Sequence, residues 1–154
     1  MEIIMNSFYF TTDEQRQYAL ACLTFAHKIG LIEDSSLESV IQRCNAENEK
    51  RRQALENGET VYGLKQFTLP VYLDYELTRF RLDFASEKDV IKNNYTYSSI
   101  EKKQLKEYFK NNRDLFTRYH GEKFRFKESQ MVVYKKIREE QYDEEINAIL
   151  RQLS

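Results

Sequence analysis

The stretch NAENEKRRQALENGETVYG, residues 45–63, decides how this chain is organised. Its first half is a charge-dense run in which residues four apart meet on one helix face, as Glu47 and Arg51 would. Gly58 is a natural helix end, because glycine readily takes the left-handed conformation that closes a helix. The Val-Tyr-Gly step that follows looks extended. The stretch therefore predicts a long helix that stops at Gly58 and continues into a short extended connector.

Helical patterns continue on both sides of this stretch. Capping-box pairs, Ser35 with Glu38 and Ser98 with Glu101, mark two helix starts, and Pro70 fits a helical first turn. The helices are expected over about Thr12–Ile29, from Ser35 to Gly58, from Thr68 until fraying near Asp89 to Asn94, from Ser98 to Asn112, and over about Glu128–Leu153. Strand-like alternation occurs only near residues 124–127. With 4 Gly and 1 Pro, the chain has little material for a many-turned β fold. The sequence predicts an all-α protein of about five helices in an irregular bundle with one short extended connector.

Length and charge bound the organisation and the partners. The 154 residues suit one helical domain, 1–154, in which the apolar residues 1–10 form an extended arm. The formal net charge of -1 argues against nucleic-acid binding and against a polybasic membrane anchor. No segment is apolar for long enough to span a bilayer, and the N-terminus lacks a signal-peptide pattern. Two cysteines, Cys22 and Cys44, read as free thiols in a reducing compartment, so we expect a cytoplasmic protein.

The sequence offers no recognisable catalytic or metal-binding motif. The two histidines, His27 and His120, do not lie at metal-ligand spacing from Cys, Asp or Glu. Neither a nucleophile-elbow pattern nor a phosphate-cradling glycine loop is present. We therefore expect no metal and no cofactor, and the catalytic residues, if there are any, are unknown.

The opening stretch has two interpretations. Glu47 and Arg51 could form a solvated pair on the helix surface. Alternatively, Asn48 and Arg51 turn inward and satisfy backbone groups of the connector near Tyr62, which would otherwise lack partners. On the second interpretation Glu47, Asn48 and Arg51 form a structural clasp that holds the connector in shape.

Aromatic residues are unusually frequent. The chain has 11 Tyr and 10 Phe, more than one small helical core easily hides. A stripe of such rings is more often core than a ligand site. Because tyrosine can bury its ring and keep its hydroxyl in water, some of the rings could instead line a groove for a peptide. The peptide-binding candidates are Tyr62, Tyr72, Tyr75 and Phe80.

Two blocks resemble a known family. They are residues 30–68, GLIEDSSLESVIQRCNAENEKRRQALENGETVYGLKQFT, and the pair formed by SSIEKKQLKEYFKNNRDLF (98–116) and KFRFKESQMVVYKKIREEQYDEEI (123–146). They are similar to the helical chaperone-like regions of SurA/PrsA-type foldases, relatives of the parvulin peptidyl-prolyl isomerases. The short helix that precedes the isomerase domain in that family is matched by Leu105, Lys106, Tyr108, Phe109, Asn112 and Phe116. No counterpart of the isomerase domain follows Phe116, so the resemblance implies the peptide-holding part alone.

Three functions are compatible with these features of the sequence. The first is a chaperone-like protein that holds an extended or unfolded polypeptide client in an aromatic groove. The second is an enzyme or accessory subunit of peptide natural-product maturation, with Glu47, Arg51 and a tyrosine as acid–base groups, which requires a raised pKa at Glu47. The third is a structural protein that forms a homodimer through its aromatic face.

Overall fold

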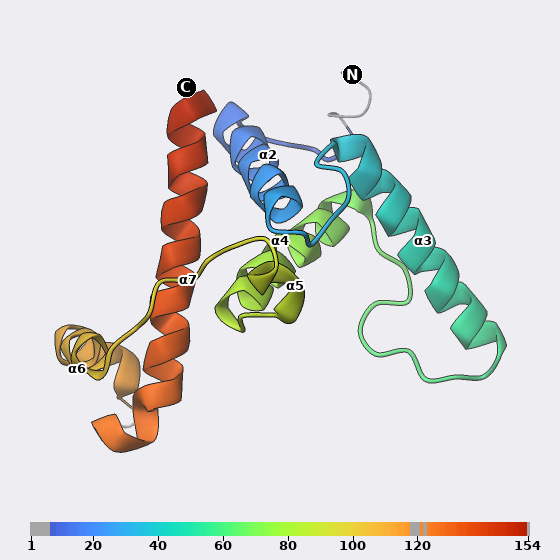
Figure 1. The fold of residues 1–154 in the computed structure, drawn as a ribbon. Helices are drawn as coiled ribbons and strands as arrows, with labels where there is room; N and C mark the ends of the chain where they lie inside the picture. Colours follow the sequence, from blue (N-terminus) through green and yellow to red (C-terminus); the bar gives the residue numbers. More distant parts are fainter. Residues whose placement is uncertain (1–6, 118–120, 122, 154) are drawn as a thin grey trace.

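The chain folds as an irregular bundle of α-helices (Figure 1). The computed structural model describes residues 7–117, 121 and 123–153. Within these residues the helices are α2 (Asp13–Lys28), α3 (Leu37–Glu56), α4 (Leu69–Ala85), α5 (Asp89–Lys92), α6 (Lys102–Asn111) and α7 (Phe126–Leu153), with a 3-10 turn η1 (Arg113–Phe116). The all-α prediction is confirmed, including the extended connector between α3 and α4. Most of the predicted arm, residues 1–6, lies outside the described residues, as does His120.

Local signals explain where most helices begin and end. The Thr12 hydroxyl accepts from the amide N–H of Gln15 and caps α2, which satisfies one free N–H of the first turn. After α2, Gly30 has φ +86, and a Cβ there would lie 2.4 Å from the Asn94 side-chain nitrogen. Glycine is therefore required at this turn for two reasons, its conformation and the closeness of Asn94.

Both predicted capping boxes were misplaced. The N-cap of α3 is Ser36, whose hydroxyl accepts from the Ser39 N–H. Asp34 accepts from the Ser36 N–H and thereby starts the helix one residue later than expected. The N-cap of α6 is Glu101, which forms a capping box with Gln104. The carbonyl of Ser98, expected to open this helix, instead accepts a hydrogen bond from α7.

Two further local predictions were wrong. The chain near Asp89 to Asn94 does not fray but forms the short helix α5. Among the described residues near 124–127 the strand-like alternation forms no strand: an isolated bridge joins Thr117 to Lys123, and α7 already begins at Phe126. An apolar–polar alternation this short lacks the partner strand that a sheet would need.

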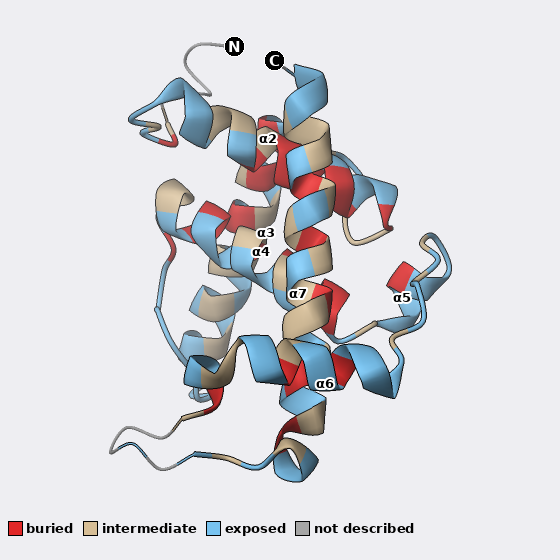
Figure 2. Ribbon diagram, turned by 90° about the vertical axis from the view of Figure 1, so that its left-hand side faces the viewer, coloured by how far each residue is buried: buried red, intermediate tan, exposed pale blue. Residues whose placement is uncertain are grey.

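Helix α7 is the axis of the molecule, and different helices pack along its two halves (Figure 1). Its C-terminal half lies against α2 and α4. The rings of Phe25, Phe84 and Tyr142, one from each of these three helices, lie 5.6–5.8 Å apart in the main core. Burying each such ring contributes about 1.5–3 kcal/mol. Figure 2 shows the buried positions facing this junction.

A second, smaller core joins the N-terminal half of α7 to α6 and η1. Its buried members are Leu105, Phe109, Phe116 and Val133. The rings of Phe109 and Phe116 lie 5.0 Å apart. The molecule therefore has two packed regions along one long helix.

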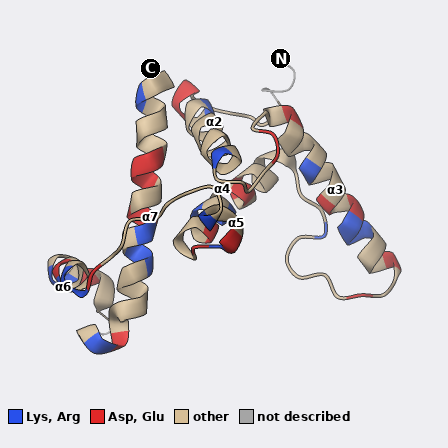
Figure 3. Cartoon of the chain, in the orientation of Figure 1, with Lys and Arg blue, Asp and Glu red and all other residues tan. Residues whose placement is uncertain are grey.

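Ion pairs between helices add to the packing. Asp and Glu follow Lys and Arg along α7 (Figure 3), and Arg81 of α4 donates to Asp143 at 2.9–3.0 Å and to Glu139 at 3.2 Å. On the other side of α4, Arg43 of α3 holds Glu76 through two hydrogen bonds of 2.7 and 3.0 Å. Such bidentate ion pairs fix the relative orientation of the two side chains as well as their distance. No described helix is both long and apolar enough to cross a membrane.

Candidate functional site

Asn48 of α3 is bound to the connector by two reciprocal hydrogen bonds. Its Oδ1 accepts from the Phe67 N–H at 2.7 Å, and its Nδ2 donates to the Phe67 carbonyl at 3.0 Å. A side-chain amide presents one acceptor and one donor edge, as a backbone peptide does. Asn48 therefore gives the irregular backbone at Phe67 the partners that a neighbouring strand would give.

Arg51 holds the same connector one helical turn later. Its Nη1 donates to the carbonyls of Tyr62 at 2.8 Å and Leu64 at 2.6 Å, and its Nε donates to Glu47 at 3.0 Å. Its guanidinium lies 4.8 Å from the centre of the Phe67 ring. The structure thus brings Glu47, Asn48 and Arg51 together beside the connector. Their role as a clasp stays a prediction.

The four predicted peptide-binding residues do not form one accessible groove. Tyr62 and Tyr75 are 84% and 48% exposed, but Tyr72 and Phe80 are only 7% and 5% exposed. Burial, followed by the nearby Glu76, raises the pKa of the Tyr72 hydroxyl. The groove assignment was therefore wrong for Tyr72 and Phe80, because both rings are packed in the main core.

The hypothesis that Glu47 and Arg51 act as acid–base groups also lacks the environment that it requires. A general acid or base must be free to exchange a proton with a substrate instead of being held in an ion pair. The structure instead pairs Glu47 with Arg51, and Tyr62 contributes its backbone carbonyl to that cluster while its ring faces solvent. Within the described part of the chain, no three His, Cys, Asp or Glu residues are placed to hold a metal ion.

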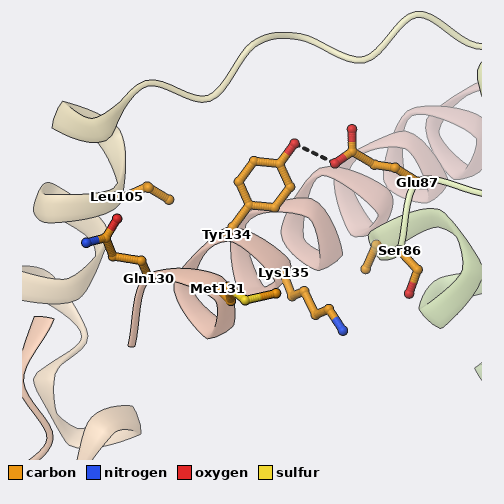
Figure 4. A pocket seen from close by; sticks show the side chains of 8 residues that line it. Ser86, Glu87, Leu105, Gln130, Met131, Tyr134 and Lys135 are labelled. Carbon is orange, nitrogen blue, oxygen red and sulfur yellow. Dashed lines mark hydrogen bonds between the residues drawn. The ribbon is translucent and has the colours of Figure 1, made fainter. Parts of the chain in front are cut away.

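Sequence reasoning missed a polar cluster at a pocket between the end of α4, α6 and α7. The pocket has a volume of about 360 Å³, and its lining includes Glu87, Leu105, Met131 and Tyr134. In Figure 4 the Tyr134 hydroxyl points to the Glu87 carboxylate, to which it donates a hydrogen bond. Glu87 has φ +52, a left-handed conformation that is uncommon for any residue other than glycine.

Arg138 completes the cluster behind the pocket. It is 2% exposed, and its Nη2 donates to the Ser98 carbonyl at 2.6 Å and to the Tyr134 hydroxyl at 3.1 Å. Its Nη2 also lies 3.6 Å from the Glu87 carboxylate. The four-residue spacing of Tyr134 and Arg138 was a usable signal. Glu87 lies 47 residues before Tyr134 along the chain, so only the fold could reveal it.

Two solved structures share this fold. Both are crystal structures of the GH136 lacto-N-biosidase from Eubacterium ramulus, one of the native protein and one of its selenomethionine derivative. Each is 24% identical to this chain with a TM-score of 0.72, and the matches cover 88% and 89% of this chain. This chain spans only 28% of the length of those proteins. No protein-family model and no curated protein matches the sequence.

The resemblance to SurA/PrsA-type foldases was wrong, and so was the peptide-holding function drawn from it. The fold is instead shared with part of the GH136 lacto-N-biosidase from Eubacterium ramulus. The residues that suggested the resemblance have a plain structural role, because Leu105, Phe109 and Phe116 form the smaller core. Any short amphipathic helix that folds back onto a longer helix needs apolar residues at similar spacing.

Proposed function

We propose that this chain is the helical part of a glycan-hydrolysing enzyme, and that it supports a catalytic part instead of supplying the catalytic carboxyl groups. The observation that carries the proposal is the fold shared with the GH136 lacto-N-biosidase, which covers 88% of this chain but only 28% of the enzyme. The partner would be the polypeptide that carries the remaining, catalytic portion.

The state of the carboxylates supports a non-catalytic role. Most glycoside hydrolases use two carboxyl groups on either side of the bond that is cleaved. The two buried acids of the described chain are both engaged by cations: Glu76 by Arg43, and Asp83 by Arg79 and Lys88. Glu47, which lines a pocket beside the connector, is held by Arg51. None of these carboxylates is left free to work as one of a pair.

A chimera tests the proposal. The region of the Eubacterium ramulus enzyme that matches this chain is replaced by this chain, and hydrolysis of p-nitrophenyl lacto-N-bioside is measured. The control is the same enzyme with the matched region deleted. We expect the chimera to be at least about tenfold more active than the deletion, and this chain alone to be inactive.

Two results would overturn the proposal. One is a chimera that is folded by circular dichroism, elutes as a single species, and is no more active than the deletion. The other is hydrolysis by this chain alone, abolished by a carboxylate substitution within it, which would make the chain itself catalytic.

We also infer a cytoplasmic location. Cys22 and Cys44 are both buried and unpaired, which is typical of a reducing compartment. Fractionation of the native host with an antibody to the chain tests this, and recovery outside the cell would contradict it.

A further inference from the structure

Another cavity lies between α2 and α4, away from the Glu87 cluster. It has a volume of about 350 Å³. Gln15 and Tyr18 of α2 line one side of the cavity, together with Thr11, which precedes the N-cap of that helix. Leu73 and Asp74 of α4 line the other side. Residues 8–10 also line it. Clefts between helices of a bundle are common ligand sites, and this volume lies within their usual range.

The aromatic part of this cleft is partly open to solvent. Tyr9 is 77% exposed, and Tyr18 is exposed on α2. Tyr9 has φ +53, a left-handed conformation that costs a bulky residue about 1–2 kcal/mol. Backbone strain of this kind concentrates at functional sites. The neighbouring rings of Phe8 and Phe10 stack with their centres 5.8 Å apart, and both pack on the main core, which anchors the segment that carries Tyr9.

The polar part of the cleft offers one fixed donor group and one acceptor group. The Oε1 of Gln15 accepts from the Thr11 N–H at 3.0 Å and from the Thr11 hydroxyl at 2.8 Å. These bonds fix the Gln15 amide and leave its Nε2 hydrogens available as donors. The Asp74 carboxylate is exposed and has no hydrogen bond or ion pair to another described residue. Asp74 is therefore a free acceptor at the edge of the cleft.

We propose that this cleft is a saccharide-binding site of the chain itself, for a neutral sugar unit of the glycan. The inference rests on the proposed function, whose substrate class it names. A sugar ring has an apolar C–H face that can lie on Tyr9 or Tyr18, and hydroxyl groups that can donate to Asp74 and accept from Gln15. An anion would be repelled by Asp74, and a purely apolar ligand would desolvate that carboxylate without compensation. A cation would suit Asp74 and the rings but would meet the Gln15 donor.

Titration of the whole chain with lacto-N-biose, followed by ¹H–¹⁵N NMR, tests the site. We expect saturable shifts of amides in residues 8–19 and 70–77. Tyr9→Ala and Asp74→Ala should each weaken binding at least about tenfold. Tyr62→Ala, which removes another exposed ring from the distant connector, is the matched control and should bind as the unmodified chain does.

Three outcomes would overturn the proposal: no saturable shifts, shifts confined to other regions, or variants at Tyr9 and Asp74 that bind as the unmodified chain does. Choline is the second probe, and tighter binding of choline than of the disaccharide would assign the cleft to cations. The two proposals fail separately. If the chimera is active but this chain does not bind lacto-N-biose, the sugar-site proposal is refuted and the supporting role is retained.

Discussion

Replacing Asn48 by alanine tests the clasp directly. The substitution removes the two hydrogen bonds between the Asn48 amide and the Phe67 backbone, of 2.7 and 3.0 Å. Each contributes about 1 kcal/mol, and leaving the half-buried Phe67 backbone groups unpaired raises the total loss to about 2–4 kcal/mol. Alanine is the better helix former and restores about 0.5 kcal/mol. The free energy of unfolding should therefore fall by about 1.5–3.5 kcal/mol, and Tm by about 5–10 °C.

Urea denaturation followed by circular dichroism at 222 nm measures this change. Arg52→Ala is the matched control on the same helix, since Arg52 pairs with Glu49 and Glu56 but all three side chains are more than half exposed to solvent. It should leave the unfolding curve almost unchanged. If the Asn48→Ala curve shifts no further than the Arg52→Ala curve, Asn48 does not hold the connector.

Three further predictions concern the Glu87 cluster and two tyrosines, Tyr18 and Tyr108, whose hydroxyl groups are partly shielded from solvent. Arg138→Met should lower the free energy of unfolding, measured in urea, by about 3 kcal/mol, because it leaves the Glu87 carboxylate and the Ser98 carbonyl without their cationic partner. A loss below about 1 kcal/mol would contradict this. Glu87→Gly should be about 1 kcal/mol more stable than Glu87→Ala, since only glycine takes φ +52 without strain; equal stabilities would show that the strain is absent. Burial raises the pKa of Tyr18 and Tyr108 to about 12. Between pH 10 and 12 the unfolded chain therefore loses protons that the folded chain keeps, and stability in urea should fall as pH rises, whereas a flat profile would argue against buried hydroxyls.

The helices could be read from the sequence because their signals are local. The helix expected over about Thr12–Ile29 is found as α2, because Thr12 caps its start and Gly30 follows its end. The predicted start of α6 was misplaced for a reason that local patterns cannot supply. Ser98 was expected to open α6, but its carbonyl accepts from Arg138, 40 residues later. A capping pattern gives the types of residue near a helix start, and tertiary partners decide which of them is used.

The candidate site was less predictable than the fold. The contacts of Asn48 and Arg51 involve a connector only 11–19 residues away along the chain, so the charge-dense stretch itself suggested them. The exposure of individual tyrosines depends on the angles between helices, which periodicity does not give. Tyr72 and Tyr75 lie three residues apart on one helix, yet one is buried and the other is half exposed. The short pattern from Leu105 to Phe116 led to the wrong family because its apolar residues reflect only the packing of a helix and the turn after it, which many unrelated proteins share.

The most direct test of the supporting role is the ratio of two values of kcat/KM for p-nitrophenyl lacto-N-bioside: that of the chimera with this chain, divided by that of the enzyme with the matched region deleted. If this chain can replace the helical region of the lacto-N-biosidase, the ratio should be at least about ten. A ratio near one, obtained with a folded chimera, would contradict the account.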